Sequence, residues 1–230
     1  MRYLLLIMCV FCAPAFAATG ADPLLYKVQV EELEWRNAEG GNKRAWDIEG
    51  WVGKDRDKLW IKTEGESSSD DTEEFELQLL YDRAVAPNWD LQLGWRGDFQ
   101  PESRRSWLTI GMQGLAPGFI ETDAAVFLAS DGRTAARVRA SYELLFTQKL
   151  ILQPGVELNW YAEDDEVNGL GSGWSSFELG LRLRYHVTRK FAPYAGLHWD
   201  RKFGETADLA EAAGEETGDL QFVAGLSVWF

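Results

Sequence analysis

The amino-acid sequence predicts an all-β chain that folds as a transmembrane antiparallel β-barrel of about twelve strands. Three observations support this class: apolar and polar residues alternate along many segments, an export signal opens the chain, and long and short connections alternate. The C-terminal segment LQFVAGLSVWF places six residues on one apolar face, namely Leu220, Phe222, Ala224, Leu226, Val228 and Phe230. Alternation with period two indicates a strand, and an apolar face opposite a polar one is typical of a membrane barrel.

Residues 1–17 have the composition of a secretory signal peptide. Arg2 precedes the apolar run 3–11, and the sequence AFA at 15–17 forms a small-x-small cleavage position. We expect the mature protein, residues 18–230, to form one outer-membrane β-barrel domain. Both cysteines lie within the removed segment, so we expect no disulfide and no cysteine metal ligand in the exported protein.

The charge of the mature chain excludes some classes of partner. Once Arg2 is removed, 22 basic and 37 acidic side chains remain, a formal charge of −15. This balance argues against nucleic acid and anionic lipid surfaces, and favours soluble cations as partners. Because no mature segment approaches the roughly 18 consecutive apolar residues of a membrane helix, the chain can span a membrane only as a closed sheet.

The strands are predicted from segments in which every second residue is apolar. Twelve segments qualify: 26–30, 46–52, 59–61, 75–81, 89–95, 108–112, 120–128, 138–146, 150–160, 177–185, 195–199 and 220–230. An even number suits a bacterial barrel. Pro154 and Pro193 each remove one backbone donor, so the register of those two strands is the least certain.

The connections between these strands alternate in length. After the odd-numbered strands come the polar stretches NAEGGNKR, GESSSDDT, QPESRR, ASDGRT, AEDDEVNGLGSG and a segment from Phe203 to Gly218, and several of them are rich in acidic residues. After the even-numbered strands come the short turns KDRDK, RAVAPN, LAPG, TQK and TRK. Long loops on one side and short turns on the other predict an outer-membrane protein with both termini in the periplasm.

Aromatic residues near the strand ends support a lipid-facing exterior. The residues expected to form interfacial girdles are Trp46, Trp89, Trp160, Trp199, Tyr26, Tyr81 and Tyr185. A soluble β-sandwich also favours aromatic residues and alternation, but the export signal and the alternating connections favour the barrel. Trp51, Trp60, Trp107 and Tyr161 fall on the opposite phase and are expected to fill part of the lumen.

The polar phase of the strands places charged side chains in the lumen. The acidic candidates for a metal-attracting patch are Asp47, Glu49, Glu64, Glu74 and Glu76. A cationic wall further round the barrel is predicted from Arg96, Arg137, Arg139, Arg182 and Arg184. Such an arrangement either concentrates cations in an acidic vestibule or locks the lumen with ion pairs, and the sequence leaves both interpretations open.

Two histidines, His186 and His198, are the best side chains for Cu(II) in the mature chain. His186 is expected at the periplasmic end and His198 roughly 20 Å farther along the barrel, at about 3.3 Å per residue. They therefore do not form one site, although His198 could join Asp200 and acids on neighbouring strands. Because a lone imidazole is weak evidence for a metal site, the sequence favours a structural or solvated role for each histidine. The sequence has no GxSxG, HExxH or phosphate-binding glycine loop, so we do not expect an enzyme.

Long ordered motifs in this chain resemble one known family. They are YDRAVAPNWDLQLGWRGDF, GMQGLAPGFIETDAAVFLASDGRTAARVRASYELLFTQKLILQPGVELN, GSGWSSFELGLRLRYHVTRKFAPYAG and WDRKFGETADLAEAAGEETGD. They are similar to the barrel portion of the copper resistance protein B family, from about Asp22 to the end of the chain. Many members of that family carry a Met- and His-rich segment before the barrel, and residues 18–24 leave no room for it.

The resemblance implies an outer-membrane protein of copper homeostasis and resistance that binds copper ions, without copper being essential for folding. It also implies outer-membrane lipid and periplasmic copper-handling proteins as partners. We therefore expect a barrel that binds, sequesters or passes copper through an acidic lumen. The alternative is a general small-solute porin or a structural barrel with no metal preference.

Overall fold

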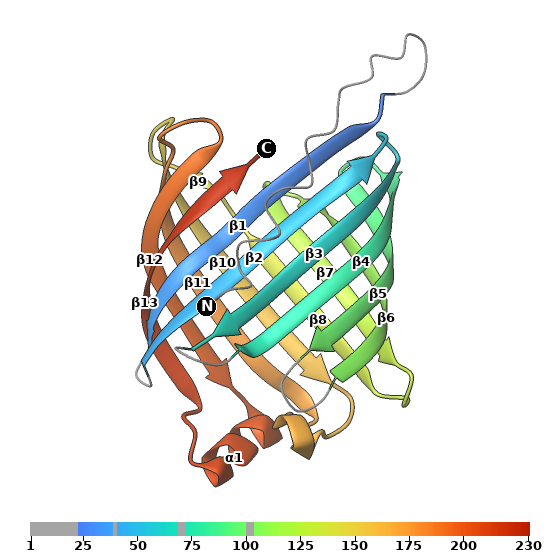
Figure 1. The fold of residues 1–230 in the computed structure, drawn as a ribbon, viewed down its shortest axis with the longest axis vertical. Coiled ribbons are helices and arrows are strands. Elements are labelled where there is room, and N and C mark those ends of the chain that lie inside the picture. Colours follow the sequence, from blue (N-terminus) through green and yellow to red (C-terminus); the bar gives the residue numbers. More distant parts are fainter. Residues whose placement is uncertain (1–22, 39–40, 69–71, 100–103) are drawn as a thin grey trace, which may run out of the picture.

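The computed structural model describes residues 23–38, 41–68, 72–99 and 104–230 of the chain, which form one closed antiparallel β-barrel (Figure 1). The predicted signal peptide, residues 1–17, lies outside these ranges. Each strand pairs with its neighbours in sequence, and the ring is completed where β1 pairs with β13. The predicted fold class and the twelve-stranded wall are confirmed.

The elements follow one another as a meander around the ring. In order they are β1 Leu25–Ala38, β2 Gly41–Gly53, β3 Asp57–Ser67, β4 Thr72–Ala86, β5 Trp89–Phe99, β6 Arg104–Ala116, β7 Ile120–Ala129, β8 Thr134–Ser141, β9 Leu144–Leu145, β10 Leu150–Tyr161, the 3₁₀ turn η1 Glu166–Asn168, β11 Gly173–Tyr185, β12 Phe191–Lys202, α1 Gly204–Ala213 and β13 Gly218–Trp229.

Strands β8 and β9 occupy one position in the wall, because both pair with β10. The sequence predicts a single strand over 138–146, but the structure interrupts it at Tyr142 and Glu143. The interruption lies opposite Pro154, which has no N–H to donate to the ladder. The proline thus explains the break in the predicted strand.

The junction between β1 and β13 removes the last free edges of the sheet. Val28 donates its N–H to the carbonyl of Phe230 (3.3 Å), and Phe230 donates to the carbonyl of Val28 (2.9 Å). A membrane-spanning sheet needs this closure because hydrocarbon offers no hydrogen-bond partner to an open edge. Within the part of the chain that the structure describes, no helix is long and apolar enough to cross a membrane.

The outer face of the wall is apolar and exposed. Leu59, Leu79, Leu93 and Leu108 are each about half exposed, and the alternate residues on the same strands point into the lumen and are mostly buried or half-buried. The predicted apolar sets therefore face outward, as lipid-facing residues must.

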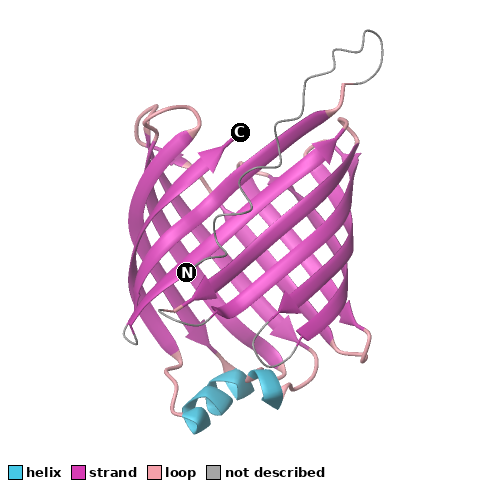
Figure 2. Cartoon of the chain, viewed as in Figure 1, coloured by secondary structure: helices cyan, strands magenta, loops and turns pink. Residues whose placement is uncertain are grey.

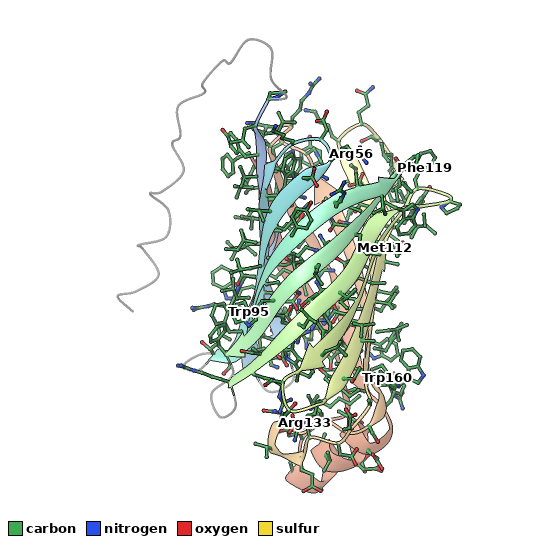
Figure 3. The ribbon with its side chains drawn as sticks, turned by 90° about the vertical axis from the view of Figure 1, so that its right-hand side faces the viewer. Arg56, Trp95, Met112, Phe119, Arg133 and Trp160 are labelled. Atoms are coloured by element: carbon green, nitrogen blue, oxygen red, sulfur yellow. The ribbon has the colours of Figure 1, made fainter. Side chains whose placement is uncertain are left out.

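Aromatic residues mark the outer face near both ends of the barrel. Trp95 and Trp160 lie toward the end that carries Arg133, while Arg56 and Phe119 lie at the opposite end (Figure 3). Ring contacts join three further outward residues of β2, β4 and β5, with Trp46 6.1 Å from Phe75 and Phe75 5.4 Å from Phe99 between centroids. Tyr26, Tyr81 and Tyr185, which the sequence predicts in an interfacial girdle, are exposed near the end that carries Arg56 and Phe119.

The two ends of the barrel differ in their connections (Figure 2). The loop end carries segments 162–172 and 203–217, which contain η1 and α1, and the turn end carries tight connections such as 54–56 and 117–119. The prediction of a long loop at 37–44 is wrong, since β1 runs to Ala38 and β2 begins at Gly41. Strand backbone extends through most of this polar stretch.

The loop-end segments pack on each other as a cap beside the lumen. Thr206 of α1 is buried, accepts a hydrogen bond from the N–H of Gly171 (2.8 Å) and donates to the hydroxyl of Ser175 (3.0 Å). Asp165, 3% exposed, pairs with Arg133 (2.9 Å) and with Arg105. Hydrogen bonds therefore hold the two cap segments together, and an ion pair joins the cap to the loop end of β6.

A β-bulge in β1 changes which residues of that strand face inward. Its register shifts between Val30 and Glu32, so Leu33 and Trp35 are exposed on the outside whereas Glu34 is buried inside. A bulge inserts one extra residue and moves the following side chains to the other face. The second half of β1 therefore places acidic side chains in the lumen, whereas an unbroken alternation from Tyr26 would place them outside.

Gly65 gives a test of how the outer aromatic residues pack. A Cβ at Gly65 would overlap the Trp46 ring and a backbone oxygen of β4. We expect Gly65→Ala to displace the indole and lower the free energy of unfolding by about 1–3 kcal/mol. Urea unfolding in lipid vesicles measures this loss. Gly155→Ala is the matched control, because its nearest neighbouring atoms are 3.9 Å away, and an equal loss in both variants would contradict the packing argument.

Candidate functional site: the charged lumen

The inner face of the wall carries the charged residues that the sequence singled out. Asp47 and Glu49 lie on β2, Glu64 on β3, and Glu74 and Glu76 on β4. The predicted cationic residues come from three more strands: Arg96 from β5, Arg137 and Arg139 from β8, and Arg182 and Arg184 from β11. Except for Glu74, which is exposed, these side chains are buried or half-buried. Burial thus agrees with the predicted inward phase for nine of these ten residues, while Glu74 pairs in register with Glu66 at the loop end.

The largest ion-pair network, the central network, runs across the lumen. It joins Glu64 and Glu76 on one side to Arg137, Arg139 and Glu157 on the other. Glu64 contacts both arginines, and Arg137 Nη2 lies 3.1 Å from Glu76 Oε2. Because β5, β6 and β7 separate β4 from β8 around the ring, these bonds bridge the lumen rather than follow its wall.

Arg96 extends the central network toward an aromatic cluster. Its guanidinium lies 2.8 Å from Glu76 and 2.7 Å from Asp98, and 4.4 Å above the Phe127 ring. Trp107 donates its indole N–H to Asp98 at 2.7 Å and packs with Phe127. This cluster confirms that Trp107 points inward and fills part of the lumen.

A second network, the β1 network, joins β1 to β11 and β3. Arg182 bonds to Glu34 (2.6 Å) and Glu32 (2.7 Å) across β12 and β13. Arg36 lies beside the same two carboxylates and reaches Glu66 of β3 at 3.1 Å. Glu32, Glu34 and Arg36 were not predicted as lumen residues from the sequence. The shift of the apolar pattern from Val30 to Leu33 is the signal that could have revealed them.

A third group lies toward the turn end. Lys62 pairs with Asp123 at 2.7 Å, reaching from β3 to β7, and its ammonium lies 5.4 Å from the Trp60 ring centroid. Asp82 is fully buried and accepts hydrogen bonds from Gln92 (3.1 Å) and a second glutamine of β6. Trp60 thus also points inward, as predicted.

Three of the predicted carboxylates stand apart from these networks. Among the described residues, no basic side chain lies within ion-pairing distance of Asp47, Glu49 or Glu74, although Glu64 and Glu76 are both paired. The lumen arginines Arg137, Arg139 and Arg182 each bond to acids. Asp47, Glu49 and Glu74 therefore remain as acids without an ion-pair partner on the part of the wall formed by β2, β3 and β4, where they can attract a cation.

The two histidines occupy separate places. His186 follows the last residue of β11 at the turn end, where its ring lies 5.3 Å from that of Trp229. His198 is buried in β12, with Nε2 3.3 Å from Arg36 and 3.7 Å from Glu178. Asp200 instead accepts a hydrogen bond from Gln221 at 3.3 Å. Within the described ranges, no three His, Cys, Asp or Glu side chains are grouped as a ready metal site.

The sequence comparisons decide the family. A family model described as Copper resistance protein B precursor matches residues 24–230. Copper resistance protein B of Escherichia coli is 44% identical over 205 residues, which cover 89% of this chain and 69% of that protein. The chain belongs to the copper resistance protein B family. A homologue from Pseudomonas syringae pv. tomato is 45% identical over 200 residues, covering 87% of this chain and 68% of the relative.

Solved structures agree with the fold of this copper resistance protein B family member. The NanC porin superposes with a TM-score of 0.56 at 12% identity, covering 89% of this chain and 99% of the porin. The KdgM porin gives 0.52 at 8% identity, covering 88% and 98%. At such identities the likeness concerns the fold alone. Family and fold together place the protein in the outer membrane.

The central network predicts a narrow path for ions. We expect the double variant Arg137→Gln, Arg139→Gln to conduct severalfold more current than the wild type in planar bilayers, because the bonds to Glu64 that bridge the lumen are lost. Arg83→Gln, Arg201→Gln is the matched control, since it removes two exposed guanidinium groups. Equal conductance in all three proteins would show that the central network does not limit passage.

The cap gives a pH-dependent prediction. Burial raises the pKa of Asp165, but hydrogen bonds from Arg105 and Asn168 and the nearby charges outweigh burial and hold this pKa below its ordinary value of 3.8. Such a group stabilises the cap fully above pH 3.8, and the contribution is lost as pH falls through the lower folded pKa. Hydrogen exchange over 162–172, corrected for intrinsic rates, should show protection at pH 5 and its loss in acid.

The substitution Asp165→Asn should reproduce the acid result at pH 7, with faster exchange over 162–172. Asp208→Asn removes an exposed carboxylate from α1 and should leave that segment protected. If the two variants exchange alike, the ion pairs of Asp165 do not hold the cap.

Proposed function

We propose that this barrel binds copper ions in its acidic lumen and passes them across the outer membrane. Membership of the copper resistance protein B family supports copper as the ion. The carboxylates of Asp47, Glu49 and Glu74 on the inner wall support a route through the lumen. These carboxylates have no basic partner within ion-pairing distance in the described structure, while the arginines around them are paired. That local excess of negative charge is the observation on which the proposal depends.

The route would run past three carboxylates and the central network. A cation entering at the loop end meets Glu74 near the start of β4, then Asp47 and Glu49 along β2. For a given set of oxygen or nitrogen ligands, Cu(II) binds more tightly than the other first-row divalent ions, and a field of one sign raises the local concentration of counter-ions. The central network lies beside this path and would restrict it until the Arg137 and Arg139 side chains move.

In this proposal copper is cargo for the barrel and not a resident cofactor. We place the turn end in the periplasm, where the protein would exchange copper with periplasmic copper-handling proteins. The basic residues Lys54, Arg56, Lys149, Arg189 and Lys190 lie at that end and would suit an acidic partner surface.

The relatives and structural neighbours are named as a resistance protein and porins, and we propose no catalysis.

Copper flux into vesicles tests the proposal. Vesicles that contain the wild-type barrel and a copper-sensitive dye should take up Cu(II) faster than they take up Ca²⁺. The triple variant Asp47→Asn, Glu49→Gln, Glu74→Gln should slow Cu(II) uptake severalfold, because the unpaired acids of the wall are removed.

The matched control for this experiment is Asp55→Asn, Asp208→Asn, Glu211→Gln, which removes three exposed acids outside the lumen. It should transport copper as the wild type does. Equal uptake of both ions that is insensitive to the lumen acids would support the rival function, a general porin. No uptake by the wild type would indicate a structural barrel.

A further inference from the structure

The guanidinium of Arg36 is enclosed by groups that usually bind a cation. Its Nε lies 3.0 Å from Glu34, its Nη1 lies 3.1 Å from Glu66, and its Nη2 lies 3.6 Å from Glu32. The same Nη1 lies 3.3 Å from Nε2 of His198. Three carboxylates and an imidazole from β1, β3 and β12 therefore surround one positive charge.

The contact with Arg36 fixes the state of the imidazole. A guanidinium can only donate hydrogen bonds, so His198 must accept through the lone pair of Nε2 and is neutral. His198 is 5% exposed, and its Nδ1 has no hydrogen-bond partner among the described residues. A neutral imidazole whose Nε2 lone pair points at a cation is the form that ligates metals.

The donor set around Arg36 matches one class of metal ion. Imidazole nitrogen together with carboxylate oxygen suits Cu(II). Glu178 supplies one more carboxylate, 3.7 Å from Nε2 of His198. The described residues do not form a ready group of three metal ligands, because the guanidinium itself stands between Glu66 and His198.

We propose that the Arg36 guanidinium occupies a copper site. When this side chain moves away, a Cu(II) ion binds in its place to His198 Nε2 and to the carboxylates of Glu66 and Glu34. This site rests on the proposed function and specifies where in the lumen the copper ion binds. It differs from the pairing of His198 with Asp200 that the sequence suggested, since Asp200 bonds to Gln221 instead.

The remaining charges favour a divalent ion in the place of Arg36. Glu34 and Glu32 keep their bonds to Arg182, at 2.6 Å and 2.7 Å, when Arg36 leaves. Those bonds hold the Glu34 carboxylate in position, so the ligands need little reorganisation. Among the described residues, the carboxylates of Glu32, Glu34, Glu66 and Glu178 then outnumber Arg182 and Lys43, the basic side chains that remain ion-paired with them.

Exposure of the side chains provides a way in from the loop end. The Glu34 side chain is 0% exposed, Arg36 12%, Glu66 19% and Lys43 28%. Arg36 lies two residues before the end of β1, so its long side chain can turn toward the loop end without moving the strand. An arriving ion would meet Glu66 first and the buried Glu34 last.

Copper binding to the full barrel in detergent tests the site. Arg36→Gln should bind Cu(II) about tenfold more tightly than the wild type, since a like charge within about 4 Å no longer opposes the ion. Electron paramagnetic resonance should show nitrogen coupling from one imidazole in this variant. The double variant Arg36→Gln, His198→Ala should lose both the added affinity and the nitrogen signal.

Arg201→Gln is the matched control, because it removes an exposed arginine of β12 and should bind copper as the wild type does. If Arg36→Gln does not fold into a heat-modifiable barrel, Arg36→Leu, which adds no metal ligand, replaces it in the same comparison. No gain in affinity, or a gain that survives loss of His198, overturns the site. Wild-type copper uptake that depends on the lumen acids would still support the proposed function, so the two failures are distinguishable.

Discussion

The structure depends on one constraint: in hydrocarbon every backbone N–H and C=O must find its partner within the protein. The meander of β1 to β13 satisfies it only because the first and last strands pair, through Val28 and Phe230 among others. Closure in turn fixes two faces, since successive side chains point alternately to lipid and to the lumen. The apolar exterior and the charged interior are therefore consequences of the same ring.

The interior meets the cost of burying charge by pairing most of it. Isolated buried ions are expensive, and removing one partner of a pair leaves the other uncompensated. The central network places Arg137 between carboxylates of β3 and β10, and in the β1 network Arg182 bonds to Glu32 and Glu34, both on β1. These bonds brace the wall from within and narrow the lumen at the same time. Stability and restricted passage thus share the same residues.

Much of the fold could be predicted from the sequence because alternation assigns each residue to a face. It identified Glu64 and Arg137 as lumen residues, but which residues meet across the lumen depends on strand stagger and curvature, which alternation does not encode. It failed in β1, where a bulge after Val30 brings Glu34 inward, and opposite Pro154, where the ladder breaks. The contact between Arg36 and His198 could not be predicted either, since their strands β1 and β12 lie on opposite sides of β13.

The pairing of β1 with β13 has a consequence for how the protein is made. The partners Val28 and Phe230 stand near the two ends of the described chain, so the ring cannot be completed until every strand has left the ribosome and crossed the inner membrane. Until then the unclosed sheet exposes two unpaired edges and an apolar surface to water, a state that is prone to aggregation. Assembly therefore requires that these edges and this surface be shielded until β1 pairs with β13.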